Sequence, residues 1–513
     1  MDYLSAINGV IHVPPLHSVL KALFVAWAVY FFFDCVYSIY FHPLRHFPGP
    51  FWASISNFWK LYIAITKESH IRGIKYHEKY GPVIRVAPNL LVFNDPMLLP
   101  TVYHRYADKT DFYSPGVLGR VTPPFQTKDH KEHAMKRKRV APSFQMTNLK
   151  KLEVEVDDSI NQLTSIFEEK YAEKDIQIDL SDWLKWFIYD TVSGLAFGKS
   201  PGFVKNGMDV EGLIESFHSM APMAGLVATL PHIMNSILNT PILGNWLMPH
   251  SGDGTGTGRI MQFRDNMLQD RLANRHENAH GDFLDNIMNA KNSDGSFMTE
   301  DEIKVEALVL MVAATDTTAA FIGSFVQNII SNSVVHERLQ NEIQEFDVQE
   351  RLNTGVVTYE EALTLPYFQA CIKESLRFSP STPFMMPRLV SKGGITINGI
   401  FVPEGTEIGA NPYVVHRDTK VFGADAANFN PDRWLASEAR TKEMDKYVLT
   451  WGYGPRICLG KNIAQMITNK LCLELFRKFN FGCVNPEQPW REENLAIMVY
   501  YDHWLSIKPK TRA

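Results

Sequence analysis

The stretch Trp451-Gly452-Tyr453-Gly454-Pro455-Arg456-Ile457-Cys458-Leu459-Gly460 places one cysteine in a glycine-rich loop just before a helical pattern. Gly454 and Gly460 are expected to adopt backbone conformations that a side chain forbids. Arg456 puts a fixed positive charge two residues from the sulfur. The N–H groups and dipole at the start of the following helix are expected to favour the ionised thiol. A lone cysteine is usually a small buried apolar residue, but this setting predicts that Cys458 binds a haem iron.

This loop resembles the haem-binding signature of the cytochrome P-450 superfamily, in which a cysteine thiolate is the axial iron ligand. The family usually opens the loop with phenylalanine where this chain has Trp451, whose indole can still cover the sulfur. The resemblance implies a mainly α, cytochrome P-450 fold, a large helical body with a small β-rich region. It implies haem b (iron protoporphyrin IX) as cofactor, with Cys458 as iron ligand. Trp451, Arg456 and Gly460 would bind the haem around it.

Composition indicates one large globular catalytic unit. The chain has 513 residues, of which 45% are hydrophobic and 21% charged, enough to bury an extensive core. The formal net charge of −5 is too small to suggest a nucleic-acid partner. The 5 cysteines are not paired by their spacing, which favours a reducing compartment over a disulfide framework.

The amino-terminal segment is expected to anchor the protein in a membrane. Residues 19–41 are almost wholly apolar and aromatic, interrupted only by Lys21 and Asp34, and this length can span a bilayer. A cleaved signal peptide is the alternative, but the stretch lacks a basic start and a convincing cleavage site. We therefore expect one transmembrane helix before the body.

Three prolines follow the apolar segment. Pro43, Pro48 and Pro50 fix φ and exclude helix, so residues 42–50 are expected to be a stiff connection. The predicted organisation is an amino-terminal segment with the anchor (residues 1–41), a proline-rich hinge (42–50) and a haem-thiolate catalytic domain (51–513). The hinge resembles that of microsomal family members, which implies a single-pass protein of the endoplasmic reticulum membrane whose catalytic domain faces the cytosol.

Two short segments of the chain predict β-hairpins. Residues 83–86 and 90–93 are β-like runs on either side of a turn. Residues 395–397 and 400–402 flank Asn-Gly, the strongest hairpin signal in the chain. Almost everything between residues 148 and 378 is expected to be helix or helix-connecting loop.

A long buried helix is predicted after the capping-box pattern of Thr299 and Glu302. Its apolar run, residues 303–330, is interrupted by Asp316 and Thr317. Buried polar groups of this kind need hydrogen-bond partners or a functional role. The plain interpretation is that the hydroxyl bonds back to a carbonyl one turn earlier and the acid pairs with a distant base. The run also resembles the oxygen-activating helix of the family, which implies that Asp316 and Thr317 are catalytic and relay protons to dioxygen.

Glu374 and Arg377 lie on one helix face at i, i+3 and can pair. A solvated surface pair is the usual outcome of this spacing. Glu374, Arg377 and Arg433, the last of these in Asn-Pro-Asp-Arg-Trp, occur in an order that resembles the structural triad of the family. The resemblance implies a buried network that holds the core beside the haem and takes no part in the reaction.

The resemblance implies three more residues that bind the haem: His133 and Arg137 on one helix, and Arg388.

 The sequence His133-Ala134-Met135-Lys136-Arg137 stands where the family has its propionate-binding helix. The plain alternative for the basic residues 136–139 is a solvated face. Arg137 is expected to turn inward, and Lys136, Lys138 and Arg139 are expected to face outward as a docking patch for an acidic redox partner.

The function implied by this resemblance is that of a haem-thiolate monooxygenase. It would oxidise, most simply hydroxylate, a hydrophobic small molecule with O2 and electrons from an NADPH-cytochrome P-450 reductase, with cytochrome b5 as a second candidate donor. The segments expected to line the pocket are apolar and Met-rich; they are residues 112–125, 217–227, 381–386 and 496–500 and the region of Ala313.

Residues 416–434 resemble fungal members of specialised metabolism, including the pisatin demethylase-like group, which implies a terpenoid, polyketide or alkaloid substrate. Two alternatives stay open. One is a haem-thiolate isomerase or dehydratase that works without reductase, although such members commonly lose the threonine that is present here as Thr317. The other is a non-catalytic haem electron-transfer protein, which would need neither a large apolar pocket nor a buried acid–threonine pair.

Overall fold

A single long helix, α16 (Glu300–Ile330), organises the body of the protein. We analysed a computed structural model that describes residues 16–113, 121–174, 176–238, 240–254, 256–273, 283–292 and 295–510. The predicted capping box is present, because Thr299 and Glu302 exchange side-chain and backbone hydrogen bonds. Most of α16 is buried against α9 (Leu180–Phe197), α19 (Pro366–Phe378) and α23 (Lys461–Lys478). The predicted central helix is therefore confirmed.

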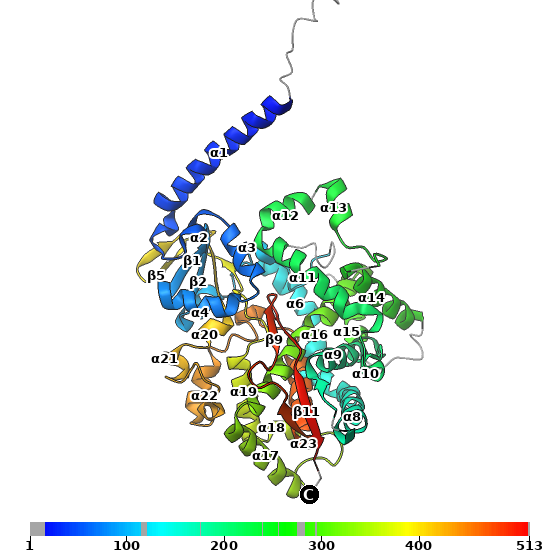
Figure 1. Cartoon of the computed structure of the whole chain (residues 1–513). Coiled ribbons are helices and arrows are strands. Elements are labelled where there is room, and N and C mark those ends of the chain that lie inside the picture. Colours follow the sequence, from blue (N-terminus) through cyan, green and yellow to red (C-terminus); the bar gives the residue numbers. More distant parts are fainter. Residues whose placement is uncertain are drawn as a thin grey trace, which may run out of the picture.

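The remaining helices surround this core (Figure 1). In the amino-terminal third they are α1 (Leu16–Tyr40), α2 (Phe51–Ile55), α3 (Phe58–Ile65), α4 (Ser69–Tyr80), α5 (Leu99–Val102), α6 (His130–Val140), α7 (Met146–Leu149) and α8 (Glu153–Lys170). In the middle they are α10 (Phe203–Asn206), α11 (Leu213–Thr229), α12 (Pro231–Leu238), α13 (Pro241–Leu247), α14 (Gly256–Ala273) and α15 (Phe283–Met288). After α16 come α17 (Ser333–Val348), α18 (Tyr359–Leu363), α20 (Pro412–Val415), α21 (Thr419–Phe422) and α22 (Glu438–Asp445).

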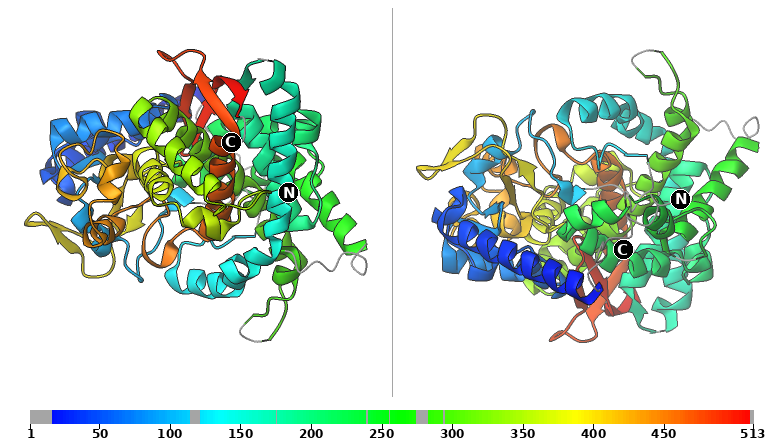
Figure 2. Two further views of the ribbon diagram at one scale, coloured as in Figure 1. Left: turned by 90° about the horizontal axis from the view of Figure 1, so that it is seen from below. Right: turned by 90° about the horizontal axis from the view of Figure 1, so that it is seen from above.

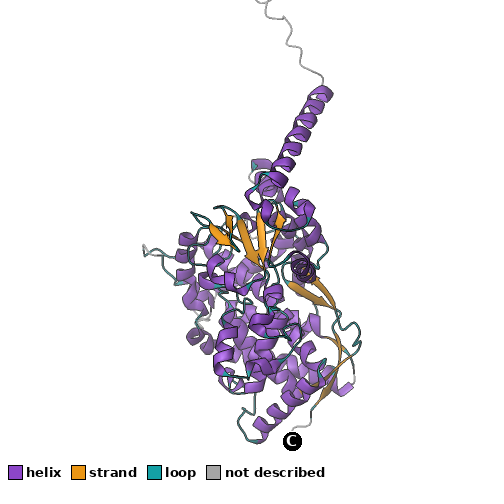
Figure 3. Ribbon diagram, turned by 90° about the vertical axis from the view of Figure 1, so that its left-hand side faces the viewer, coloured by secondary structure: helices purple, strands orange, loops and turns teal. Residues whose placement is uncertain are grey.

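The strands form small sheets at the edges of the helical body (Figure 3). The largest has the order β1-β2-β7-β4, with β1 (Val83–Ala87), β2 (Leu90–Phe93), β7 (Glu407–Ala410) and β4 (Arg388–Leu389), and only β2 and β7 are parallel in it. A second sheet has the order β3 (Ile178–Asp179), β11 (Trp504–Pro509), β8 (Phe479–Cys483). The pairs β5 (Ile395–Ile397) with β6 (Ile400–Val402) and β9 (Arg491–Asn494) with β10 (Met498–Tyr501) are hairpins.

Both predicted hairpins are confirmed. In the β5–β6 hairpin, Asn398 and Gly399 have φ of 51° and 79°, the left-handed pair that a tight Asn-Gly turn requires. This hairpin projects from one side of the body and the green helices around α14 from the opposite side (Figure 2). The expectation of helix throughout residues 148–378 misses the two-residue strand β3, because its partner β11 lies more than 300 residues away in the sequence.

The helix α1 is the expected apolar span. It projects away from the body and exposes its side chains (Figure 1). Of the described helices, α1 and α16 are long and apolar enough to cross a membrane, but the apolar window of α16 is 72% buried inside the protein while that of α1 is 0% buried. The apolar pattern of α16 is thus explained by the core, whereas that of α1 fits a single membrane anchor.

The proline-rich stretch ties α1 to the β-rich region. Leu44 is fully buried there, and the N–H of Arg85 in β1 donates to Pro48 O at 2.8 Å. A Cβ on Gly49 would lie 2.1 Å from Arg85 O, so only glycine fits at this contact. The guanidinium of Arg85 also donates to Ser38 O at the end of α1, at 2.9 Å. These contacts fix how α1 leaves the body.

Candidate active site

The cysteine loop is shaped by two glycines and one short hydrogen bond. Gly452 and Gly454 have φ of 76° and 61°, and a Cβ on Gly454 would lie 2.5 Å from Tyr103 O. The N–H of Cys458 donates to Trp451 O at 2.6 Å and closes the loop. Left-handed backbone and close approach make glycine necessary at these two positions.

The special backbone conformation expected for Gly460 is wrong. Its φ is −78°, which any residue can adopt, and it is the N-cap of α23. No described protein atom outside its chain neighbours lies within 4 Å of the position that a Cβ would take. Glycine here therefore leaves open space beside the loop instead of relieving backbone strain.

The sulfur of Cys458 has an unusual environment. The residue is exposed, yet burial by the surrounding protein raises the pKa of its thiol. Both observations hold for a side chain that borders a space inside the body. The N–H groups of Gly460 and Lys461 and the charge of Arg137 lower the pKa, as expected for a helix start, but by less than burial raises it. Burial thus opposes the predicted ionisation, whereas a metal cation that coordinates a thiol removes its proton.

Four cationic side chains gather near this loop without a carboxylate partner. They are Lys109, Arg137, Arg388 and Arg456, and among the described residues none of them forms an ion pair. Lys109 and Arg388 are 6% and 4% exposed. Buried cations are normally paired, so this cluster is suited to anionic groups of a ligand.

Two of the predicted arginines are held by the backbone. Arg456 donates to Thr127 O at 2.8 Å and to Lys128 O at 2.6 Å. Arg137 donates to Ile457 O at 2.7 Å, so the helix α6 is joined directly to the cysteine loop. These bonds orient both guanidinium groups and leave several of their N–H donors for a ligand.

Arg388 and Lys109 both contact Tyr113, and nothing in the sequence indicated that Lys109 belongs to this site. Arg388 donates to the Tyr113 hydroxyl at 3.2 Å, and the Lys109 ammonium lies 3.9 Å from the centre of the Tyr113 ring. Burial and the charges of Arg388 and Arg456 hold the pKa of Lys109 well below its ordinary value. Its local sequence resembles that of any surface lysine, so only the fold reveals that it belongs to the cation cluster.

His133 lies at the same cluster, as the resemblance implied. It is buried, and burial together with the nearby charges of Arg456 and Lys109 lowers the pKa of its imidazole to about 3. The ring is therefore neutral at physiological pH and can donate one hydrogen bond without adding a further charge to the cluster.

One face of the central helix borders open space. Ala313 is exposed and Thr317 half-buried in a helix whose neighbouring residues are mostly buried. The two are one turn apart, so they share a face. The Thr317 hydroxyl donates to Ala313 O at 2.8 Å, which is the local bond that the plain interpretation expected. A hydroxyl that donates in this way keeps its lone pairs toward the open side.

Asp316 pairs with a histidine that sequence reasoning missed. Nε2 of His218 in α11 lies 3.0 Å from Oδ2 and 3.1 Å from Oδ1 of Asp316. Asp316 is 5% exposed, whereas the His218 side chain is 16% exposed. The distant base of the plain interpretation therefore exists, and it connects the buried carboxylate to solvent. The two residues are 98 positions apart in the chain, so no local pattern could have joined them.

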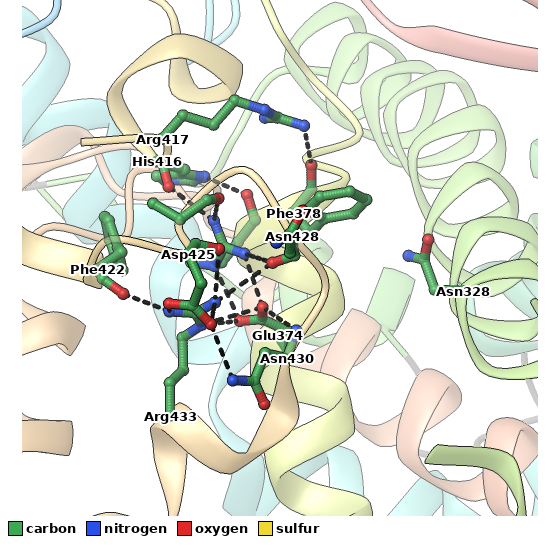
Figure 4. Close-up of polar contacts among 12 residues, drawn as sticks. Asn328, Glu374, Phe378, His416, Arg417, Phe422, Asp425, Asn428, Asn430 and Arg433 are labelled. Carbon is green, nitrogen blue, oxygen red and sulfur yellow. Dashed lines mark hydrogen bonds and ion pairs between the residues drawn. The ribbon is translucent and has the colours of Figure 1, made fainter. Parts of the chain in front are cut away.

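The predicted triad is a buried network (Figure 4). Glu374 and Arg377 are fully buried and form two hydrogen bonds, of 2.7 and 2.8 Å. Arg433 reaches the same carboxylate at 3.0 Å, and Trp434 donates to it at 2.9 Å. Arg377 also donates to His416 O at 2.8 Å, which joins α19 to the segment after α20. The surface-pair alternative is excluded by this burial.

The predicted pocket segments come together in part. Phe112 stacks on Phe384 with ring centres 5.5 Å apart, so the segment 112–125 meets the segment 381–386. Residues 114–120 of the first segment lie outside the described part of the chain, as do the side chains of residues 221–223. The aromatic contact forms an apolar wall close to the cation cluster, because Tyr113 also packs against Phe384.

One part of the predicted docking patch is wrong. Arg139 is only 9% exposed and pairs with Glu302 of α16 at 2.8 Å, so it does not face a partner. Its place at the end of the basic run 136–139 gave no sign of this partner, which lies 163 residues away in the sequence. Lys131 and Lys138 on the same helix are exposed.

Comparison with known proteins decides the family. The family model for cytochrome P450 matches residues 33–502. The chain is a cytochrome P-450. The matched region includes the cysteine loop, the central helix and the buried glutamate–arginine network of this P-450.

The relatives of this P-450 are fungal enzymes. It is 30% identical to quiannulatic acid synthase of Emericella variicolor over 452 residues, which cover 86% of this chain and 87% of the relative. It is also 30% identical to the cytochrome P-450 monooxygenase gsfF of Penicillium aethiopicum, over 92% of this chain and 95% of the relative. The monooxygenase cicH of Emericella nidulans is 30% identical over 94% and 97% of the two chains. The protein is thus an oxidoreductase of the monooxygenase class.

The residues present fit the haem-thiolate group of this family. Cys458 offers a sulfur that borders internal space, and Gly460 leaves room beside it. The unpaired cations Lys109, Arg388 and Arg456 suit carboxylate groups at one edge of a flat apolar ligand. A protein that bound only an apolar guest would have no use for such a cluster.

Proposed function

We propose that this P-450 uses haem b to oxidise a hydrophobic small molecule of fungal secondary metabolism, most simply by hydroxylation. The observation that carries the proposal is the arrangement around Cys458, a thiol bordering internal space beside a cluster of unpaired cations. When bound, a haem with a thiolate ligand activates dioxygen for insertion into a C–H bond. The names and sources of the relatives support the fungal setting.

The residues around the cofactor would have separate tasks. Cys458 would ligate the iron, Trp451 would cover the loop, and Gly460 would give space and an N–H to the sulfur. Arg137, His133, Arg388 and Arg456 would bind the carboxylate edge of the haem, with Lys109 as a further cation. The network of Glu374, Arg377 and Arg433 would hold the core below the cofactor and would not react.

Asp316 and Thr317 would supply protons on the open side of α16. Thr317 keeps its hydroxyl oriented by the bond to Ala313 O, and Asp316 immediately precedes it in the helix. His218 contacts Asp316 and is partly exposed, so it would return a proton from solvent to the carboxylate after each transfer. The route places an imidazole between solvent and a buried acid.

Removing the hydroxyl of Thr317 is expected to divert reducing equivalents to hydrogen peroxide. Because proton delivery contributes orders of magnitude to such steps, Thr317→Ala should raise peroxide per NADPH roughly tenfold or more. Thr315→Ala is the matched control, since Thr315 makes the same bond to a carbonyl, at 2.8 Å, but is buried on another face. Peroxide, NADPH and O2 are measured with a fungal reductase. Equal peroxide yields in both variants would contradict the role of Thr317.

Electrons would come from an NADPH-cytochrome P-450 reductase, with cytochrome b5 as a second candidate donor. A basic surface on this P-450 would dock on an acidic surface of its redox partner, because docking surfaces carry complementary charges. The exposed Lys131 and Lys138 on α6 support such a contact, because Arg137 on the same helix donates to Ile457 O in the cysteine loop.

Reversing one charge on this surface is expected to weaken reductase docking. Lys138→Glu should raise the reductase concentration for half-maximal turnover about three- to tenfold at low salt, and less at high salt. Lys205→Glu on α10 is the control, because it reverses an equally exposed charge on another part of the body. Turnover is titrated with reductase at two ionic strengths. A salt dependence identical to that of the wild type would exclude Lys138 from the contact.

The protein would lie in the endoplasmic reticulum membrane with its body in the cytosol. Exposed apolar residues of α3 and α13, such as Phe58 and Trp246, lie at the end of the body from which α1 projects (Figure 1). All 5 cysteines are free, which suits the reducing side of the membrane. We propose three units along the chain, the anchor segment 1–41, the hinge 42–50 and the catalytic domain 51–513.

The proposed activity is tested with full-length protein, a fungal reductase and NADPH. Apolar terpenoids, polyketides and alkaloids are screened first by the change in the haem spectrum on binding and then by mass spectrometry of the products. Gain of one oxygen atom that depends on NADPH supports the proposal. A rearranged or dehydrated product formed without NADPH would instead identify an isomerase or dehydratase.

A further inference from the structure

The imidazole of His416 joins the end of α19 to the segment that leads into the cysteine loop. His416 is fully buried beside the network of Glu374 and Arg377 (Figure 4). Its Nδ1 lies 2.8 Å from Arg377 O, and the backbone N–H of Leu449 donates to its Nε2 at 2.7 Å. Each ring nitrogen therefore has a main-chain partner, and the two partners belong to different segments.

These partners define the tautomer of the ring. Burial lowers the pKa of the His416 imidazole to about 3, so the ring is neutral and carries one proton. A backbone N–H can only donate, so Nε2 accepts from Leu449 and the proton is on Nδ1. Nδ1–H then donates to Arg377 O, which can only accept. The neutral ring thus satisfies both partners at once.

The carbonyl that His416 contacts lies in the last turn of α19. The last C=O groups of a helix have no partner inside the helix and need one from elsewhere. Arg377 O finds this partner in His416, and the neighbouring Leu376 O accepts from the Thr450 hydroxyl at 2.5 Å. The end of α19 is therefore the support that holds Leu449 and Thr450, the two residues just before the cysteine loop.

Leu449 also begins the turn that enters this loop. Its carbonyl accepts the N–H of Gly452 at 2.8 Å, and Gly452 has a left-handed φ of 76°. Trp451 lies within the turn, and its carbonyl accepts the N–H of Cys458 at 2.6 Å. The backbone of Cys458 is thus bonded to a turn whose first N–H is held by His416.

We propose that His416 is a positioning residue for Cys458, because its Nε2 holds the turn to which the cysteine is bonded. Leu449 is fully buried, so loss of this acceptor would leave a buried N–H without a partner. The turn would then move toward another acceptor, and the cysteine would move with it. The inference rests on the proposed role of Cys458 as iron ligand, whereas the contact of His416 with Leu449 is independent of that role.

Two substitutions separate the two hydrogen bonds of the ring. His416→Gln puts an amide oxygen near the position of Nε2, so it keeps an acceptor for Leu449 and loses the donor to Arg377 O. His416→Asn has a shorter side chain, which keeps a donor near the position of Nδ1 and loses the acceptor. Positioning through Nε2 predicts that His416→Gln preserves the cysteine loop and that His416→Asn does not.

The first test measures hydrogen exchange at the Leu449 amide. Full-length protein with its haem is exchanged in deuterated buffer and analysed by mass spectrometry at single-residue resolution. We expect slow exchange in the wild type, exchange about tenfold or more faster in His416→Asn, and a rate within about threefold of the wild type in His416→Gln. Unprotected exchange in the wild type, or equal acceleration in the two variants, would overturn the proposal whatever Cys458 binds.

The second test follows the iron ligand in the same proteins. With carbon monoxide, reduced His416→Asn should show about three- to tenfold less of the red-shifted Soret band of a thiolate complex than the wild type, the effect of one lost buried hydrogen bond. His416→Gln should retain most of the band. Loss of the band in His416→Gln would overturn the proposal even if His416→Asn does not fold.

His503→Asn is the matched control for these measurements. His503 is also a fully buried histidine, with Nε2 2.9 Å from Gln327 Oε1, but it belongs to another part of the body. This variant should be less stable to denaturant and should keep the thiolate band. Equal losses of the band in His503→Asn and His416→Asn would show a general effect of lost packing and contradict the proposal. A wild type without the band would contradict the proposed iron ligand, and the exchange rates of Leu449 would still test the contact with His416.

Discussion

Replacing Cys458 with alanine is expected to reduce monooxygenase activity to background. The thiol is the described sulfur that borders internal space beside the cation cluster, and no other ligand in the loop can replace it. The reduced protein with carbon monoxide should lose the red-shifted Soret band of a thiolate complex, because that band reports the axial sulfur. The measurement is the difference spectrum of the purified full-length protein together with its haem content.

Cys483→Ala is the control for this prediction. Cys483 is half-buried in the strand β8 and is distant in sequence from the loop, so its loss should leave the spectrum unchanged. A thiolate band that persists in Cys458→Ala would mean that another cysteine ligates the iron. A wild-type spectrum typical of histidine ligation would contradict the assignment of the ligand altogether.

Removing the charge of Glu374 should have the largest effect on stability. Its carboxylate accepts hydrogen bonds from Arg377, Arg433 and Trp434, and from the backbone N–H of Asn430 at 2.8 Å. Glu374→Gln would leave the buried Arg377 guanidinium without a counter-ion and Arg433 with Asp425 alone. The loss of one partner from a buried ion pair lowers the free energy of unfolding by about 3–5 kcal/mol. A whole domain has only about 5–15 kcal/mol, so the variant should be recovered with little haem.

Glu438→Gln provides the comparison for this effect. Glu438 pairs with Lys442 on the surface of α22, and its side chain is 81% exposed. Exposed pairs contribute about 0–1 kcal/mol, so this variant should unfold at nearly the wild-type denaturant concentration. Denaturation is followed by fluorescence and by the haem absorbance. Similar losses in the two variants would mean that the network of Glu374 carries no special stability.

Some features of this P-450 could be predicted from the sequence because they depend on neighbours in the chain. The capping box of Thr299 and Glu302 and the Asn398-Gly399 turn are set by local backbone chemistry. The apolar helix α1 and the buried helix α16 follow from their composition, although composition alone does not distinguish a span from a core helix. The ion pair between Glu374 and Arg377 follows from their i, i+3 spacing on a helix.

The sequence also determined the family, because the cysteine loop, the acid–threonine pair and the glutamate–arginine pair occur in a fixed order along one chain. The explanations that the sequence suggested for single residues were not all correct. Gly460 needs no special backbone conformation, and the surroundings of Cys458 raise the pKa of the thiol where the local pattern predicted the opposite. Desolvation depends on everything packed around a group, and no short motif contains that information.

Only the tertiary structure decided which distant residues meet. It placed His218 on Asp316, Glu302 on Arg139, and Lys109 among the cations that the motifs had named. It also placed the imidazole of His503 beside Gly323 in α16. The physical reason is common to all of them. Hydrogen bonds, ion pairs and desolvation act over a few ångströms in space, and folding brings together residues that the chain separates by a hundred positions or more.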